Sequence, residues 1–400
     1  MLYIVEDDPD FAALLKEISK EAFSDVEIFL NSPDFIKKQL TCNDVVILDI
    51  KMPKMDGVEI LRALAEKNCL SKLILISGFD SSVLHSTAML AQQLGLQVIA
   101  QITKPVEPDK VQAILASLIK QPSTNITNIA NPSTKSTVVK STHFSKEEIS
   151  KAIKDNQLVL YYQPQVDLKT NKLIGVEALV RWIHPEKSMI FPDDFLPFVE
   201  KYNLLEPLTD SIIKIAIEQE SEWEKLGYNV NVSINICASN VTSLSLPEKL
   251  EELIKKASIK PSKICFEVTE SELMGELIPS MDTLTRMRLK GFHLSIDDFG
   301  TGYSSLLQLY RIPFNELKID RSFISKLLSS SESKVIVDTC ITLSHKLGMK
   351  VVAEGIEDKE TFKLLLSMGC DIGQGYYISK PLSKLDTTYW LHEYKKVKQS

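Results

Sequence analysis

The chain has 400 residues and a formal net charge of −7 at neutral pH. An acidic chain lacks the broad basic face that nucleic-acid binding needs, so its charge argues against that class of protein. A hydrophobic content of 44% and a charged content of 25% are ordinary for a globular protein, and the length exceeds one average core. We therefore expect two domains.

Six cysteines lie scattered along the chain without a C-x-x-C pair, at Cys42, Cys69, Cys237, Cys265, Cys340 and Cys370. This spacing is typical of reduced cytosolic thiols and not of a disulfide framework or a zinc cage. The first residues turn acidic at Glu6, unlike a secretory signal, and no apolar run approaches membrane-spanning length. We expect a cytoplasmic protein that does not bind a membrane.

The first 120 residues alternate short aliphatic runs, at 2–5, 45–50 and 73–77, with helical patterns such as 11–23. Buried parallel strands read as continuous aliphatic runs of this kind. The alternation predicts an α/β domain with a doubly wound parallel sheet over residues 1–120. Functional groups are then expected at the carboxyl ends of its strands.

Residues 122–142 are rich in Ser, Thr, Asn and Pro and show neither helical nor strand periodicity. Such a segment cannot bury enough apolar surface to fold alone. We expect a flexible linker over residues 121–143, followed by a second domain over residues 144–400.

The second domain contains eight strand-like runs, mostly separated by longer helical stretches such as 246–259 and 282–292. The runs lie at 159–165, 173–182, 231–237, 263–270, 292–298, 316–320, 350–357 and 372–378. Eight such units over this length predict a (β/α)8 barrel of the TIM type. Nearly every run ends in a carboxylate, amide or lysine, and barrel active sites lie at that end.

Acidic residues follow the strands of the first domain. Glu6 and Asp7 follow the run at 2–5, and Asp49 lies at the end of the run at 45–50. Three carboxylates at one sheet edge suit Mg²⁺, which would leave Asp49 as a nucleophile towards a phosphoryl group. Lys104 would balance the remaining charge, and the Ser77 hydroxyl could follow the phosphoryl oxygens. Any one of these acids alone is more simply a solvated strand end, so the prediction depends on the ordered set.

This set, with ILDIKMPKMDG around Asp49, resembles the receiver domains of two-component response regulators over residues 1–120. The resemblance implies phosphorylation of Asp49 by a cognate sensor histidine kinase. It assigns one Mg²⁺ to Glu6, Asp7 and Asp49, and the switch roles to Ser77 and Lys104. Gln101 stands where such domains carry a switch aromatic, and the interval from Ser77 to Lys104 is longer than in compact receivers. These two departures concern the route of signal output.

Polar residues end the strand-like runs of the second domain. They are Glu177, Asn235, Glu267, Asp297 with Asp298, Lys318 with Asp320, Glu354 and Gln374. Carboxylates facing one mouth repel one another unless cations lie among them, and oxygen ligands favour Mg²⁺ or Mn²⁺. The six histidines form no zinc-binding pattern.

Paired hard cations are suited to phosphodiester cleavage, because they activate a water and stabilise the attacking and leaving oxygens. Glu354 could accept the proton of that water, Lys318 could orient it, and the Arg181 fork suits phosphate oxygens. A lone strand-end acid is more often a helix cap or an ion-pair partner, and Asp297 with Asp298 could be such a cap. Only the full set, one member per strand, favours the catalytic interpretation.

The set closely resembles the EAL family of cyclic di-GMP phosphodiesterases over about residues 145–390. The matching motifs are EALVRW (177–182), SIN (233–235), FEVTES (266–271), DDFGTGYSSL (297–306), LKID (317–320), VVAEGIE (351–357) and QGYYISKP (374–381). The resemblance implies a barrel whose first strand runs antiparallel. It also implies hydrolysis of cyclic di-GMP to linear pGpG with two Mg²⁺ or Mn²⁺ ions.

The resemblance further assigns roles to single residues. It places one metal on Glu177, Asn235, Glu267 and Asp297, and a second on Asp297, Asp298 and Asp320. It implies that Glu354 and Lys318 activate and orient the nucleophilic water. It assigns substrate contacts to Gln163, Leu179, Arg181 and Gln374. Glu270 would hold the loop from Asp297 to Leu306 in shape and link it to a homo-oligomer interface of the barrel.

Two functions of different kinds remain open from the sequence. The first is an active phosphodiesterase that is gated by phosphorylation of Asp49. The alternative is a catalytically silent barrel that binds cyclic di-GMP and acts through a protein partner. A DNA-binding output is not expected, because residues 121–400 show neither a helix-turn-helix nor a basic helix.

Overall fold

The computed structural model describes residues 1–20, 22–67, 69–78, 81–118, 144–270, 272–274, 277–300 and 306–397. The chain divides into two compact units, Met1–His143 and Phe144–Ser400. The linker predicted over residues 121–143 lies outside the described residues.

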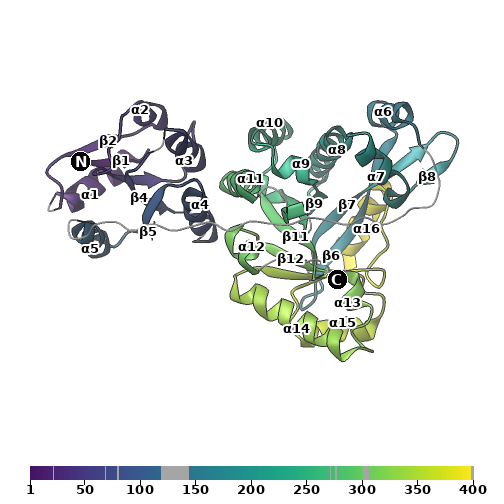
Figure 1. Ribbon diagram of the computed structural model, residues 1–400. Helices are drawn as coiled ribbons and strands as arrows, with labels where there is room; N and C mark the ends of the chain where they lie inside the picture. Colours follow the sequence, from purple (N-terminus) through teal and green to yellow (C-terminus); the bar gives the residue numbers. More distant parts are fainter. Residues whose placement is uncertain are drawn as a thin grey trace. The chain divides into compact units, whose positions relative to one another are not determined.

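The first unit is a parallel sheet with helices on both faces (Figure 1). Its strands run in the order β2-β1-β3-β4-β5. The strands are β1 (Leu2–Val5), β2 (Val26–Phe29), β3 (Val45–Asp49), β4 (Lys72–Ser77) and β5 (Gln97–Thr103). The helices are α1 (Pro9–Ser19), α2 (Ser32–Ile36), α3 (Gly57–Glu66), α4 (Ser81–Gln93) and α5 (Pro108–Leu118). The predicted doubly wound parallel sheet is confirmed.

The core of this unit explains its purely aliphatic strands. Residues of β1, β3 and β4 are buried on both faces of the sheet, and one face packs against α1 and α5. Parallel sheets that are covered on both faces require this kind of continuous apolar strand. The strand order leaves the carboxyl ends of β1 and β3 side by side, which places the residues following them at one edge.

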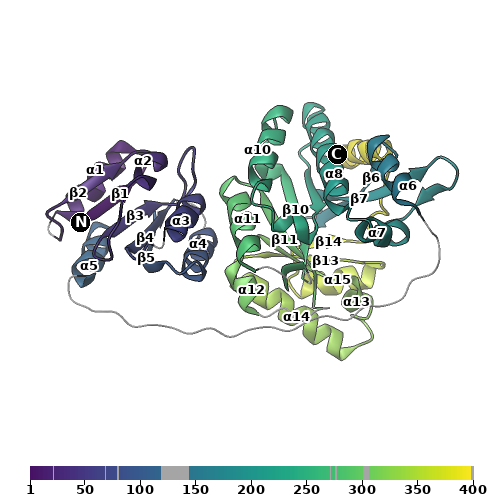
Figure 2. The ribbon, with the colours of Figure 1, turned by 45° about the horizontal axis from the view of Figure 1, so that its top comes forward.

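The second unit is a closed barrel ringed by helices (Figure 2). Its sheet runs in the order β6-β14-β13-β12-β11-β10-β9-β7-β8, and a β6–β7 pairing closes it. Strand β6 is antiparallel to both of its barrel neighbours, β14 and β7, whereas the others are parallel. The predicted barrel, with its antiparallel first strand, is confirmed. Strand β8 forms a short hairpin with the end of β7 that the eight predicted runs did not include.

The barrel strands are β6 (Leu158–Asp167), β7 (Leu173–His184), β8 (Ser188–Ile190), β9 (Asn231–Asn235), β10 (Ile264–Thr269), β11 (His293–Phe299), β12 (Glu316–Ile319), β13 (Lys350–Ala353) and β14 (Ile372–Gln374). Its helices are α6 (Lys146–Lys154), α7 (Pro192–Lys201), α8 (Leu205–Lys225), α9 (Ala238–Val241), α10 (Leu246–Ala257), α11 (Leu277–Leu289), α12 (Leu306–Arg311), α13 (Arg321–Ile324), α14 (Ser331–Lys346), α15 (Lys359–Ser367) and α16 (Lys384–Val397). Two 3-10 turns span Pro261–Lys263 and Glu272–Met274. Among the described residues, none of the helices has the length and apolarity to cross a bilayer.

Helix α8 carries an acid in an unfavourable environment. Glu220 is fully buried, and neither of its carboxylate oxygens has a hydrogen-bond partner in the described part of the chain. Burial, with a smaller contribution from Glu224, raises the pKa of Glu220 from 4.5 to about 7. The folded barrel therefore holds this proton more tightly than the unfolded chain. The contribution of Glu220 to the free energy of unfolding is fully present below pH 4.5, and roughly 3 kcal/mol of it is lost as the pH rises through the folded pKa.

Replacing Glu220 with glutamine removes this titration. We compare the free energies of unfolding of the variant and the unsubstituted chain at each pH. From about pH 4.5 to pH 8, the variant should gain roughly 3 kcal/mol relative to the unsubstituted chain. Urea unfolding followed by tryptophan fluorescence measures it, because Trp182, Trp223 and Trp390 all lie in the second unit. Glu218→Gln, an exposed position on the same helix, is the control. A pH-independent difference between Glu220→Gln and the unsubstituted chain would contradict the assignment.

Candidate active site

Three carboxylates meet at the edge of the first unit's sheet. Glu6 and Asp7 follow β1, and Asp49 is the last residue of β3. Each offers an oxygen within 4.8 Å of the others. Glu6 and Asp49 are buried, whereas Asp7 is exposed. Burial raises the pKa of Glu6, and the nearby Asp49 adds to the shift, while Lys104 opposes it. Such a group of oxygens suits a hard cation.

Lys104 supplies the positive charge of this cluster. Its Nζ lies 2.8 Å from a Glu6 oxygen and 2.7 Å from an Asp49 oxygen. The backbone N–H of Lys104 donates to the carbonyl of Ser77, the buried last residue of β4. The ammonium also lies 4.3 Å from the ring centroid of Phe11, a contact that the sequence did not indicate. The five predicted residues are thus brought together, and Gln101 is exposed on β5.

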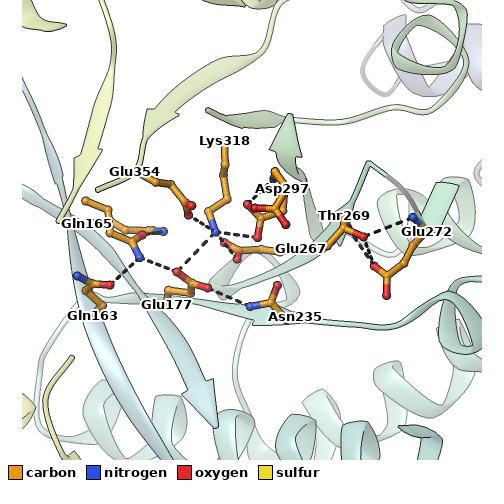
Figure 3. A network of polar contacts seen from close by, with 12 residues as sticks. Gln163, Gln165, Glu177, Asn235, Glu267, Thr269, Glu272, Asp297, Lys318 and Glu354 are labelled. Atoms are coloured by element: carbon orange, nitrogen blue, oxygen red, sulfur yellow. Dashed lines mark hydrogen bonds and ion pairs between the residues drawn. The ribbon is translucent and has the colours of Figure 1, made fainter. Parts of the chain in front are cut away.

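In the second unit the strand ends deliver polar side chains to one mouth of the barrel (Figure 3). Glu177 lies on β7, Glu267 on β10 and Asp297 on β11. Asn235 and Gln374 are the last residues of β9 and β14. Because the register aligns neighbouring strands, these side chains converge although they are up to two hundred residues apart in the sequence.

Lys318 on β12 is the centre of the cluster. Its side chain is fully buried, and its Nζ lies 2.7 Å from Glu267 and 3.2 Å from Asp297. The same nitrogen lies 3.5 Å from Glu177 and 2.6 Å from Glu354, which follows β13. Burial alone would lower the pKa of Lys318, but the four carboxylates outweigh it and raise the pKa well above its usual value. These four carboxylates therefore favour the protonated form of Lys318.

The acids around Lys318 differ in their protonation. Burial raises the pKa of Glu267 well above its usual value, although Lys318 opposes the shift. Burial likewise raises the pKa of Glu354 to about 8. Glu177 is also buried, yet Lys318 and hydrogen bonds from Gln374 and Asn235 hold its pKa below the usual range. Without a metal ion, the site thus holds more acid groups than one lysine can keep ionised.

Two groups of acids could hold cations, and they share Asp297. The first contains Glu177, Glu267 and Asp297, and the second contains Asp297, Asp298 and Glu354. Burial and its neighbour Asp297 raise the pKa of Asp298 to about 6. In both groups the oxygens lie within 4.8 Å of one another. The second group differs from the predicted one, because it includes Glu354 and not Asp320.

Asp320 and Asn235 make other contacts. The Asp320 carboxylate accepts a hydrogen bond of 3.1 Å from the Ser322 backbone and caps α13. Asn235 donates a 3.0 Å hydrogen bond to Glu177, so its amide lies beside the first group of acids. Asp320 lies outside both groups of acids, although its charge contributes to the raised pKa of Asp298, and its metal role stays a prediction. Asn235 is adjacent to the first group.

Three glutamines form a hydrogen-bonded chain behind Glu177. Gln374 donates to Glu177 at 2.5 Å and to Gln163 at 3.1 Å. Gln165 donates to Gln374 at 2.9 Å, and Gln163 donates to the carbonyl of Ser379 at 3.1 Å. The chain fixes the orientation of the Glu177 carboxylate. The sequence analysis missed Gln165, although its two-residue spacing from Gln163 on one strand placed both on the same face.

A pocket of about 270 Å³ opens above these groups. Of the predicted residues, it is lined by Gln163, Glu177, Leu179, Arg181, Asp297, Glu354 and Gln374. It is also lined by Arg321, Glu357 and Tyr376, which the sequence analysis did not single out although they lie in or beside the quoted motifs. Arg181 donates to the carbonyl of Val180 at 2.7 Å and lies 5.1 Å from the ring centroid of Phe191.

Glu270 joins two loops at the mouth. Its carboxylate accepts a 2.9 Å hydrogen bond from the Gly300 backbone, and its own N–H donates to the carbonyl of Asp297 at 3.0 Å. Residues 301–305 of the loop that Glu270 was predicted to support lie outside the described residues. Glu272, missed in the sequence, accepts hydrogen bonds from the Thr269 backbone at 3.0 Å and hydroxyl at 2.8 Å (Figure 3).

Comparisons with known proteins match both units. The EAL domain family matches residues 146–381, and the response regulator receiver domain family matches residues 2–116. The cyclic di-GMP phosphodiesterase RocR of Pseudomonas aeruginosa is 30% identical over 339 residues, which are 85% of this chain and 84% of RocR. MucR of the same organism, named a bifunctional diguanylate cyclase/cyclic di-GMP phosphodiesterase, is 38% identical over 236 residues, but these are only 34% of its length.

Solved structures agree with the barrel. The structure of the PaMucR phosphodiesterase in complex with c-di-GMP superposes with a TM-score of 0.57 at 37% identity, covering 59% of this chain and 96% of that one. An EAL domain protein from Listeria monocytogenes superposes with a TM-score of 0.56 at 36% identity, covering 62% and 98%.

Proposed function

The chain belongs to the EAL domain family and has an N-terminal response regulator receiver domain, and on this premise we propose that it is a metal-dependent phosphodiesterase that hydrolyses cyclic di-GMP to linear pGpG. The observation that supports this most is the pair of carboxylate groups sharing Asp297 around the buried Lys318. RocR, which aligns over both domains, bears the same activity in its name.

The donor set fits two hard cations such as Mg²⁺ or Mn²⁺. All donors are oxygens, and Oε1 of Glu267 is buried without a hydrogen-bond partner among the described residues. A buried carboxylate oxygen left without a partner is costly unless a cation takes that position. Glu177, Asn235, Glu267 and Asp297 would hold one ion, and Asp297 and Asp298 would hold the other, with Glu354 beside them. When bound, such ions activate a water and stabilise the oxygens of the phosphodiester under attack.

The protein groups then divide the remaining work. Glu354 accepts a proton from the attacking water, because its carboxylate lies at the pocket wall beside Asp297. Lys318 stays protonated and offsets negative charge that develops on the phosphate. Gln374 holds Glu177 in place, and Gln163, Leu179 and Arg181 line the pocket where the nucleotide binds.

Metal dependence can be tested directly. Protein treated with a chelator should lose turnover of cyclic di-GMP, and Mg²⁺ or Mn²⁺ should restore it, with linear dinucleotide identified by chromatography. Turnover that persists at full rate in excess chelator would contradict the metal role of these acids.

The receiver domain would regulate the barrel through phosphorylation of Asp49. Asp49 lies with Glu6 and Asp7 in a group that suits one Mg²⁺, and Lys104 contacts it at 2.7 Å. A cognate sensor histidine kinase would supply the phosphoryl group, and association of copies through the barrel would transmit the change. Both the kinase and the oligomer are inferred from family membership.

Asp49→Ala should abolish phosphoryl uptake and the change in turnover that phosphorylation causes. Because allosteric coupling is typically 1–3 kcal/mol, we expect phosphorylation to change turnover by about fivefold or more in the unsubstituted chain. Acetyl phosphate as donor, intact mass spectrometry and a turnover assay measure both effects. Asp34→Asn, an exposed acid on α2, is the control. Equal turnover by the phosphorylated chain and Asp49→Ala would overturn the regulatory role.

A further inference from the structure

Arg321 lines the catalytic pocket but has no role in the metal binding or proton transfer proposed above. It is the first residue of α13, directly after Asp320, and its side chain is exposed. Within the described residues, no hydrogen bond or ion pair engages its guanidinium. A guanidinium offers five N–H donors, so this one is available to a ligand in the pocket.

The chain makes room for Arg321 beside Glu354. Gly355 adopts a φ of +72°, and a Cβ at this position would lie 2.6 Å from Cβ of Arg321. No side chain larger than hydrogen fits that approach. The stem of Arg321 is therefore packed against the turn that carries Glu354, which holds the guanidinium at the pocket wall.

Arg321 and Arg181 line the pocket from different walls. Arg181 lies on β7 and Arg321 follows β12, and β13, β14 and β6 separate these two strands in the barrel. Arg181 is held by the Val180 carbonyl and by the Phe191 ring. The pocket lining also includes the acids Glu177, Asp297, Glu354 and Glu357.

We propose that Arg321 binds the phosphodiester of cyclic di-GMP that is not cleaved, and this rests on the function proposed above. The substrate contains two phosphodiesters in one ring, each with a negative charge. Cations held by the acid groups would neutralise the cleaved one. The second must enter a pocket lined by carboxylates, so it requires a positive group of the protein. The unengaged planar fork of Arg321 matches a pair of phosphate oxygens.

Binding of cyclic di-GMP tests the proposal. Calorimetric titration of the full chain in Ca²⁺ should show that Arg321→Gln weakens affinity by about 10- to 100-fold, the cost of losing a charge-assisted hydrogen bond. Arg321→Lys should lose less, because it keeps the charge. Lys326→Ala, an exposed cation just beyond α13, is the matched control and should bind as the unsubstituted chain does.

A second ligand separates phosphate recognition from base recognition. Guanylyl-guanosine has both bases but one phosphodiester and no terminal phosphate, so Arg321→Gln should leave its affinity unchanged. Calorimetric titration of Arg321→Gln with Mn²⁺ alone should match that of the unsubstituted chain and report an intact metal site. An equal loss of affinity for both nucleotides, or no loss for either, would overturn the assignment of Arg321. No binding of cyclic di-GMP by the unsubstituted chain would overturn the proposed function itself.

Discussion

Replacing Glu354 with glutamine is expected to lower kcat for cyclic di-GMP by about 10²- to 10⁴-fold, the usual contribution of a general base. The half-buried Glu354 carboxylate lies beside Asp297 and 2.6 Å from the Lys318 ammonium. Glutamine keeps the shape of the side chain but cannot accept a proton from water. The affinity for cyclic di-GMP should change much less than kcat, because the glutamine amide occupies the same position in the pocket wall.

Steady-state kinetics with Mn²⁺ and calorimetric binding in Ca²⁺ separate these two effects. Glu360→Gln, an exposed acid on α15, controls for the loss of one charge near the same turn. If Glu354→Gln kept more than about a tenth of the unsubstituted rate, the role of Glu354 as base would be wrong.

Replacing Lys318 with methionine is expected to destabilise the metal-free barrel by about 3–5 kcal/mol and to remove turnover. Lys318 is fully buried and its ammonium contacts four carboxylates, from Glu177, Glu267, Asp297 and Glu354. Methionine fills a similar volume but leaves these acids without a positive neighbour. They must then bind protons or repel one another, and either response costs free energy.

Urea unfolding followed by tryptophan fluorescence, in the presence of a chelator, measures the loss in the free energy of unfolding. Saturating Mg²⁺ should recover part of the lost stability in Lys318→Met, because cations that bind the folded state stabilise it. Lys346→Met, an exposed lysine on α14, is the matched control. Unchanged stability of Lys318→Met in chelator would show that the acids do not depend on the lysine.

The architecture of both domains was predictable because their strands have clear chemical patterns. Aliphatic runs of four to six residues in the receiver appear as β1, β3 and β4. The barrel's runs reappear as its eight closing strands. The polar residues on or just after the seven parallel strands lie at one mouth, whereas the antiparallel β6 reaches it with side chains from its middle. The antiparallel direction of β6 followed only from the family resemblance, since a strand's composition does not reveal its direction.

The residues that were missed depend on the fold in three dimensions. Arg321 lines the pocket only because Gly355, more than thirty residues later, leaves space for its stem. Asp320, which was predicted as a metal ligand, follows β12, but its carboxylate accepts a hydrogen bond from the Ser322 N–H in α13. Such a local hydrogen bond competes with a metal role, and the motif alone does not show which contact is made.

Turnover of cyclic di-GMP by the unsubstituted chain, with Mg²⁺ and with Mn²⁺ and beside Glu177→Ala and Glu354→Gln, tests whether the barrel is a metal-dependent phosphodiesterase. We predict metal-dependent release of linear dinucleotide that both substitutions abolish. Tight binding of cyclic di-GMP without turnover under either metal would contradict the hydrolytic function and would indicate a sensor that acts through a protein partner.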